Sequence, residues 1–280
     1  MSVGIVTDSN CDLPQHLIEE HGIAVVPLYI NIGTDSYLDG VEISRQEFYE
    51  GLPSFATHPT TSVPGPGQFY EAYQQLAEEG ATEILSIHIS TSLSAVVNSA
   101  RLAQEEFEAV PVTVYDSDQL TLGTGLQVLA AAHAAAEGQS ATEIVTQLKD
   151  QAARTYCFAA LNTLEFLRRS GRLSRFQWGL GSVLRIKPIL KMHGGEPEME
   201  RVRTRRAATD RVIELVRELG PLEQLTLVHT HDDQGVAALH KRARDLFPGT
   251  EAPLSAEVTP VIGTHIGPGA IGFVAVQAKG

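Results

Sequence analysis

Short apolar runs alternate with stretches of helical spacing over the first 155 residues. The predicted strands, each a short apolar run, are 3–7, 23–30, 84–89 and 112–115. The predicted helices, each with apolar positions three and four apart, are 13–21, 94–107, 122–139 and 142–153. Such alternation predicts a parallel sheet covered by helices on both faces, with ligands bound beyond the carboxyl ends of the strands.

The pattern changes from residue 156 onward. Two alternating runs, 186–193 and 197–203, are joined through Gly194 and Gly195 and predict a β-hairpin. The remaining predicted elements are strands 225–229, 255–261 and 271–278 and helices 207–219 and 235–247. We therefore expect an α/β fold with two domains. Residues 1–155 form a parallel-sheet α/β domain, residues 156–280 form an α+β domain with a mostly antiparallel sheet, and a ligand lies between them.

Hydroxyl side chains gather where the strand over 84–89 gives way to a helix. Ser90, Thr91, Ser92 and Ser94 occupy this junction. The first turn of a helix has N–H groups without intrahelical partners and carries a partial positive charge, so the junction suits an anion. The alternative is ordinary helix capping, because Ser and Thr are preferred N-caps.

Two further segments are candidates for the same site. Thr60-Thr61-Ser62 precedes a Pro-Gly-Pro-Gly turn and a helix predicted over 68–76, and His265 lies in a glycine-rich turn. The alternative for the hydroxyls is a plain turn or cap, and for the histidine a purely structural role.

Composition narrows the possible functions. The chain of 280 residues has a formal net charge of −13 and no long basic run, which argues against nucleic acid or an anionic membrane as a partner. Two cysteines exclude a disulfide framework and a four-cysteine zinc site and suit a reducing compartment. The longest apolar run, near 128–136, is too short to span a bilayer, and no signal peptide is evident, so we expect a cytoplasmic protein.

Several motifs lack the sequence context that their usual function requires. Gly267, Gly269 and Gly272 fit the G-x-G-x-x-G spacing, but too few residues follow for a dinucleotide fold, so a tight turn or a close backbone approach is expected instead. There is no phosphate loop and no nucleophile elbow, so catalysis by this chain alone is not expected. His229 and His231 have strand spacing suited to a metal, but no third ligand cluster is visible, so we expect no metal site.

Arginines are concentrated in two segments. Arg168, Arg169, Arg172 and Arg175 form the densest positive patch, for which a solvated face is the alternative interpretation. The second segment contains Arg201, Arg203, Arg205 and Arg206 and crosses from a predicted strand to a predicted helix. Guanidinium groups bind phosphate in a bidentate manner, so we consider this segment a candidate for binding an anion or a partner.

Taken together, the motifs resemble the DegV family, fatty-acid-binding proteins that act as the binding subunit of bacterial fatty acid kinase. Eight motifs match in order over the whole chain. They are Ile5-Val-Thr-Asp-Ser9 with Asp12-Leu13, Val26-Pro27-Leu28, Thr61-Ser62-x-Pro64, Ile89-Ser-Thr-Ser-Leu-Ser94, Ser170-Gly-Arg172-Leu-Ser174, Lys187-Pro188, Val202-Arg-Thr204 and His265-x-Gly-x-Gly-Ala-Ile-Gly272.

The resemblance implies a function and a site. One long-chain fatty acid occupies an apolar tunnel, its carboxylate is bonded by Thr61 and Ser94, and His265 lies close to that head group. A separate ATP-dependent kinase subunit phosphorylates the carboxylate for phospholipid synthesis, so the chain itself is not an enzyme and needs no cofactor. Arg203 is our candidate for a contact with the partner or the transferred phosphate.

Three departures from the family pattern bear on this interpretation. Val63 replaces a usual Gln, Thr91-Ser92 replaces Ser-Gly, and Ala95 replaces Gly, which affects the head-group surroundings and kinase docking. Two alternatives stay open. One is an independent phosphotransferase or hydrolase using Ser94 with His265, and the other is a carrier of another apolar carboxylate or a small phosphorylated metabolite.

Overall fold

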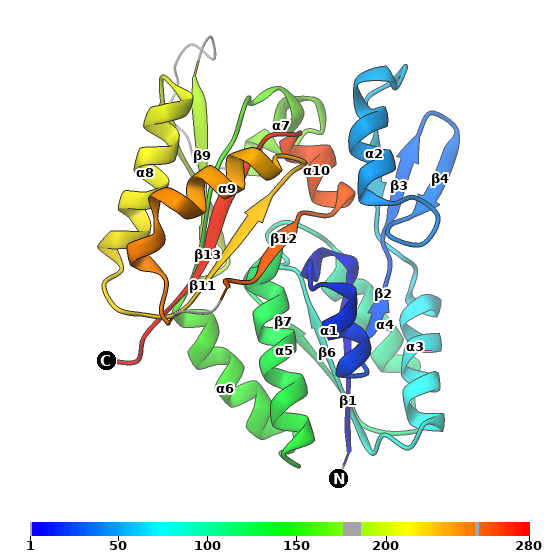
Figure 1. The fold of residues 1–280 in the computed structure, drawn as a ribbon. Coiled ribbons are helices and arrows are strands. Elements are labelled where there is room, and N and C mark those ends of the chain that lie inside the picture. Colours follow the sequence, from blue (N-terminus) through cyan, green and yellow to red (C-terminus); the bar gives the residue numbers. More distant parts are fainter. Residues whose placement is uncertain (1, 176–185, 250–251) are drawn as a thin grey trace.

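The computed structural model describes residues 2–175, 186–249 and 252–280 and arranges them around three sheets (Figure 1). The first sheet has the order β2-β1-β6-β7, and every neighbouring pair is parallel. Its strands are β1 (Val3–Asp8), β2 (Ala24–Val26), β6 (Glu83–His88) and β7 (Val112–Asp116). The parallel sheet predicted from the alternation is therefore present.

Helices cover both faces of this sheet because its strands are apolar on both sides. Ile5 packs in one core cluster with Leu126, whereas its neighbour Val6 packs in a second cluster with Phe69. Successive side chains of a strand point to opposite faces, which explains the alternation. One cluster includes residues of α1 (Gln15–Glu20), α5 (Leu122–Ala136) and α6 (Ala141–Ala153), and the other includes residues of α3 (Pro66–Glu78) and α4 (Val96–Glu106).

The predicted strand over 23–30 is two strands in two different sheets. β2 ends at Val26, and β3 (Tyr29–Ile32) pairs with β4 (Asp35–Leu38) and β5 (Thr60–Ser62) in a three-stranded antiparallel sheet. Pro27 separates the two strands and has no N–H to donate, and the N–H of Leu28 donates to Ser9 Oγ at 3.2 Å. The stretch between the predicted strands 23–30 and 84–89 thus contains the other two strands of this small sheet and α2 (Arg45–Gly51).

The second half of the chain forms the largest sheet, with the order β10-β9-β8-β13-β11-β12. Its strands are β8 (Thr155–Ala160), β9 (Lys187–His193), β10 (Glu196–Val202), β11 (Leu222–His229), β12 (Ser255–Glu257) and β13 (Ile271–Gln277). All pairs are antiparallel except β11 with β12. The predicted hairpin is confirmed, since Gly194 and Gly195 join β9 to β10 with φ of 56° and 76°. The fold class is therefore as predicted.

The two faces of this mixed sheet meet different partners. Phe158 and Phe273 pack in one cluster with residues of α8 (Arg205–Glu218) and α9 (Asp233–Arg242). Figure 1 shows both helices beside this sheet. Cys157 and Val274, on the opposite face, belong to the same core cluster as α5 of the first half. One apolar core thus lies between the two large sheets, and the domain boundary after residue 155 stays a prediction.

The strand predicted over 255–261 is too long. β12 ends at Glu257, and α10 (Pro260–Ile266) begins three residues later. Thr259 caps the helix by accepting the N–H of Val261, and Pro260 suits its first turn. His265 therefore lies in the last turn of α10, not in the glycine-rich turn that follows.

The glycines after α10 have the backbone role predicted for them. Gly267 and Gly269 have φ of 75° and 80°. A Cβ atom at Gly272 would collide with the Phe158 carbonyl oxygen of the neighbouring strand. These positions therefore serve a turn and a close backbone approach.

A buried carboxyl group ties distant segments together. Asp12 Oδ2 accepts a hydrogen bond from the Thr121 hydroxyl at 2.6 Å, and Asp12 Oδ1 accepts the N–H of Thr259 at 2.8 Å. Arg45 Nη2 lies 3.2 Å from Asp12 Oδ1. Burial raises the pKa of Asp12 from 3.8 to about 7, although Arg45, Thr121 and Thr259 each lower it.

The raised pKa of Asp12 predicts a pH dependence of stability. An acid whose pKa is higher in the folded state stabilises the fold below its unfolded pKa, and this contribution is lost as the pH rises through the folded value. The free energy of unfolding of the wild type, minus that of Asp12→Asn, should therefore fall between pH 4 and 7, by at most about 1.4 kcal/mol per pH unit. Urea titrations of both proteins measure it, and a difference that rises with pH would contradict the assignment.

Candidate functional site

A cavity of about 210 Å³ lies beyond the carboxyl ends of β1 and β6 and is closed by α10. Most of its wall is apolar. The polar residues that line it are Asn10, Thr61, Ser62, Ser94, Arg172 and His265. The structure thus brings three of the four predicted site residues to one cavity.

Thr61 and His265 meet directly although they are 204 positions apart in the sequence. Thr61 is the middle residue of β5, where it pairs with Ile30, and its Oγ1 lies 3.1 Å from His265 Nε2. Tyr49 of α2 donates to the Val258 carbonyl at 2.9 Å, which holds the small sheet's neighbouring helix against the segment that leads into α10. Packing around α10 therefore sets the distance between these two polar groups.

Ser94 reaches the cavity from the turn between β6 and α4. The N–H groups of Leu93 and Ser94 both donate to the Ser90 carbonyl, which closes this turn. The N-cap of α4 is Ala95, which makes no side-chain cap bond, and the helix begins at Val96. The helix-capping interpretation of the hydroxyl-rich junction is therefore wrong, whereas Ser94 and Ala95 both line the cavity.

A second, apolar cavity of about 50 Å³ continues the first. The residues that line both are Leu93, Leu120, Leu190, Ile262 and Ile266. Cys157 and Met192 lie at the second cavity, and burial raises the pKa of the Cys157 thiol to about 12, so this thiol is neutral. The combined space is polar at one end and apolar at the other, which suits a molecule with a polar head and a hydrocarbon tail.

Sequence reasoning missed Arg172 as a site residue. It was noted in the dense positive patch and in a family motif without a role at the site, but the structure places it at the wall of the first cavity. Arg168 and Arg169 instead pair with Glu165 at 2.8 and 2.7 Å, as a solvated face requires. The side chain of Arg175 lies outside the described part of the chain. The signal for Arg172 was its place in the Ser170–Ser174 motif.

The second arginine segment divides into different roles. Arg203 is exposed between β10 and α8 and does not line the cavity, so the structure does not bring it to the other three predicted residues. Arg205 is structural, since its guanidinium lies 2.6 Å from Asp232 Oδ2 and donates to Asn162 Oδ1 at 2.7 Å.

His229 and His231 do not share a strand face. β11 ends at His229, and His231 has φ of 50°, so the alternation on which the metal alternative rested stops before it. His229 Nδ1 accepts the N–H of Asp232 at 3.2 Å, and His231 Nδ1 lies 3.0 Å from Glu257 Oε1. Across residues 2–175, 186–249 and 252–280, no group of three or more His, Cys, Asp or Glu side chains is placed to hold a metal ion.

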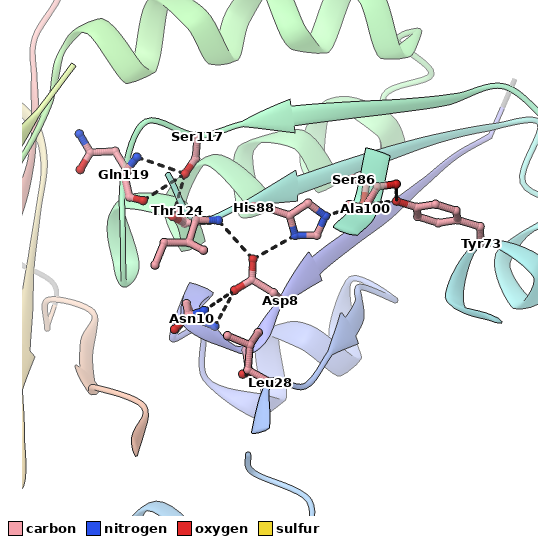
Figure 2. A network of polar contacts seen from close by, with 12 residues as sticks. Asp8, Asn10, Leu28, Tyr73, Ser86, His88, Ala100, Ser117, Gln119 and Thr124 are labelled. Atoms are coloured by element: carbon pink, nitrogen blue, oxygen red, sulfur yellow. Dashed lines mark hydrogen bonds and ion pairs between the residues drawn. The ribbon is translucent and has the colours of Figure 1, made fainter. Parts of the chain in front are cut away.

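A buried polar chain lies behind the cavity wall (Figure 2). Asp8 Oδ2 lies 3.0 Å from His88 Nδ1, and His88 Nε2 lies 2.7 Å from Ser86 Oγ. The order is that of a Ser-His-Asp triad, but all three residues are fully buried and Ser86 does not line the cavity. These contacts therefore support the site structurally and provide no accessible nucleophile.

None of the described helices has the length and apolar character needed to cross a membrane.

Comparison with known proteins assigns the family. The model described as "Uncharacterised protein, DegV family" matches residues 2–278. DegV domain-containing proteins of Streptomyces coelicolor and Deinococcus radiodurans are 38% and 39% identical to this chain, and each alignment covers 97% of both chains.

Solved structures agree over the whole fold. A fatty-acid-binding DegV family protein from Thermus thermophilus is 35% identical, with a TM-score of 0.89 over 99% of this chain and 100% of that chain. DegV from Bacillus subtilis, a fatty-acid-binding protein, is 28% identical, with a TM-score of 0.90 over 99% of this chain and 100% of that chain. The chain belongs to the DegV family.

Proposed function

We propose that this protein binds a long-chain fatty acid, with the carboxylate at Thr61, Ser94 and His265 and the hydrocarbon chain in the apolar part of the cavity. The observation that carries the proposal is the contact between Thr61 and His265 at the polar end of a cavity that continues into an apolar one. The fatty-acid-binding relatives from T. thermophilus and B. subtilis support it.

The energetics of such a ligand match the two ends of the cavity. Each buried methylene contributes about 0.8 kcal/mol, so the tail supplies most of the gross affinity. Hydrogen bonds to the ionised head group, each worth about 1.5–3 kcal/mol, supply its orientation. Arg172 adds a positive charge at the same cavity. A fatty acid therefore satisfies both ends, whereas a small phosphorylated metabolite leaves the apolar end empty.

The second part of the proposal is presentation of the carboxylate to a separate ATP-dependent kinase. The sequence has no phosphate loop of its own. Arg203 is exposed at the junction of β10 and α8, where a partner protein has access to it. We assign it a contact with the kinase or with the transferred phosphate, because guanidinium forks bind phosphate in a bidentate manner.

Removal of a head-group hydroxyl should weaken binding. Thr61→Ala or Ser94→Ala should each reduce fatty acid affinity by about 1.5–3 kcal/mol, because each loses a hydrogen bond to a charged group. Thr60→Ala is the matched control, since Thr60 lies on the same strand but does not line the cavity. Titration with a fluorescent fatty acid measures the loss, and unchanged affinity in the double variant Thr61→Ala/Ser94→Ala would refute the site.

The contribution of the head group should also be measurable as a rise in the melting temperature. A fatty acid at 100 times its Kd adds about 2.7 kcal/mol to the free energy of unfolding and raises the melting temperature. A fatty alcohol of equal chain length should stabilise less, because it buries the same tail but carries no charge for the polar end. Differential scanning calorimetry compares the two, and equal shifts would place the head group elsewhere.

Arg203 should affect phosphorylation and leave binding intact. With a bacterial fatty acid kinase added, Arg203→Ala should bind fatty acid with normal affinity but form acyl phosphate more slowly. Arg206→Ala is the matched control, because its side chain is 91% exposed on the adjacent first turn of α8. Wild-type transfer by Arg203→Ala would remove the role of Arg203, and ATP consumption by this chain alone would overturn the carrier proposal.

A further inference from the structure

Asn10 is a polar residue of the cavity wall to which the proposed function assigns no contact. It lies in a short 3-10 turn, Ser9–Cys11, directly after β1, and is only 1% exposed. It lines the first cavity together with Thr61 and Ser94 and does not line the second. Asn10 therefore lines the same cavity as two of the proposed head-group residues.

The orientation of the Asn10 amide is determined by Asp8. Both the backbone N–H and the Nδ2 group of Asn10 donate to Asp8 Oδ1, at 3.0 and 2.8 Å. A flipped amide would bring its oxygen against a carboxylate oxygen, so the side-chain NH₂ faces Asp8. The Asn10 oxygen, Oδ1, is therefore directed away from Asp8 as a fixed acceptor.

Asp8 is itself held on its other oxygen, so the amide has no freedom to turn (Figure 2). Asp8 Oδ2 accepts the N–H of Ile89 at 3.2 Å and lies 3.0 Å from His88 Nδ1. Tyr73 donates to Ser86 Oγ at 3.0 Å, and Ser86 lies 2.7 Å from His88 Nε2. With this chain fully buried, rearranging Asn10 means breaking a polar network.

The Asn10 oxygen has no hydrogen-bond donor within the described part of the chain. A buried acceptor without a partner is costly, because its desolvation is not compensated, so in native proteins such a group is paired with water or a ligand. Neither the carboxylate nor the methylene chain of an ordinary fatty acid has a hydrogen to donate. An O–H group does, and it reaches the cavity either on the ligand or as a bound water.

We propose that Asn10 is a specificity residue whose Oδ1 accepts a hydrogen bond from a hydroxyl group carried by the acyl ligand near its carboxylate. The preferred ligand class is then a long-chain hydroxy acid. The inference rests on the proposed binding of an acyl carboxylate by the same cavity.

The test compares affinities for a long-chain acid and for its 2-hydroxy and 3-hydroxy derivatives of equal length, by calorimetric titration. The wild type should bind at least one hydroxy acid about fivefold or more tightly than the unsubstituted acid, since a newly satisfied buried acceptor is worth about 1 kcal/mol or more. In Asn10→Leu, whose side chain has the same branched skeleton and no acceptor, the ratio should fall to about one. Because the ratio is taken within one protein, any general loss of stability in the variant cancels.

A control variant separates this preference from the head-group site. Thr61→Ala should weaken binding of the unsubstituted and the hydroxy acids alike and keep the ratio, because the proposed function gives Thr61 a bond to the carboxylate that all of them share. If the wild type binds the unsubstituted acid and its two hydroxy derivatives with equal affinity, the inference is overturned, but the proposed binding of fatty acid is not. If Asn10→Leu weakens binding of the unsubstituted and the hydroxy acids equally, the donor to Asn10 is water, and the inference is also overturned. Failure of the wild type to bind either acid refutes the proposed function as well.

Discussion

The buried carboxyl group of Asp12 fixes the geometry on which the cavity depends. It accepts hydrogen bonds from Thr121 and from the backbone of Thr259, and it pairs with Arg45. Thr259 caps the helix that carries His265, and Arg45 begins α2, which lies between strands β4 and β5 of the small sheet. A single side chain thus joins the first turn after β1 to the elements on either side of the cavity. Because burial favours its neutral form, this junction is sensitive to proton concentration.

The cavity arises from the way in which the two large sheets share one apolar core. Side chains from α5 and from the inner face of the mixed sheet belong to the same cluster, and the two cavities lie beside it. The predicted head-group residues Thr61, Ser94 and His265 line the first cavity where β5 and β6 finish and α10 packs. A ligand at this position contacts both halves of the chain, so its binding should also stabilise their association.

Much of the architecture could be predicted because it depends on local pattern. Strand and helix periodicity predicted the parallel sheet, and Gly194-Gly195 predicted the hairpin. The errors occurred where a single polar contact decides the outcome. Pro27 divides one apolar run between two sheets, and Thr259 starts a helix within a run of β-branched residues that resembles a strand.

The site itself needed more than local pattern. Nothing in the spacing of Thr61 and His265 places them together, because their contact depends on tertiary packing. Their residue types made both segments candidates, and the family resemblance placed them around one head group. Arg172 was visible in sequence as a charge but not as part of a cavity wall. Asn10 had no signal of its own, since its meaning depends on the orientation that Asp8 imposes.

The central claim is that this cavity holds one acyl carboxylate, and the most direct measurement is mass spectrometry of the organic extract of the purified protein. We predict a long-chain monocarboxylic acid at about one molecule per chain, retained through gel filtration and depleted in the extract of the double variant Thr61→Ala/Ser94→Ala. Recovery of a phosphorylated metabolite, or of no lipid from protein that is folded and has not been stripped, would contradict the account.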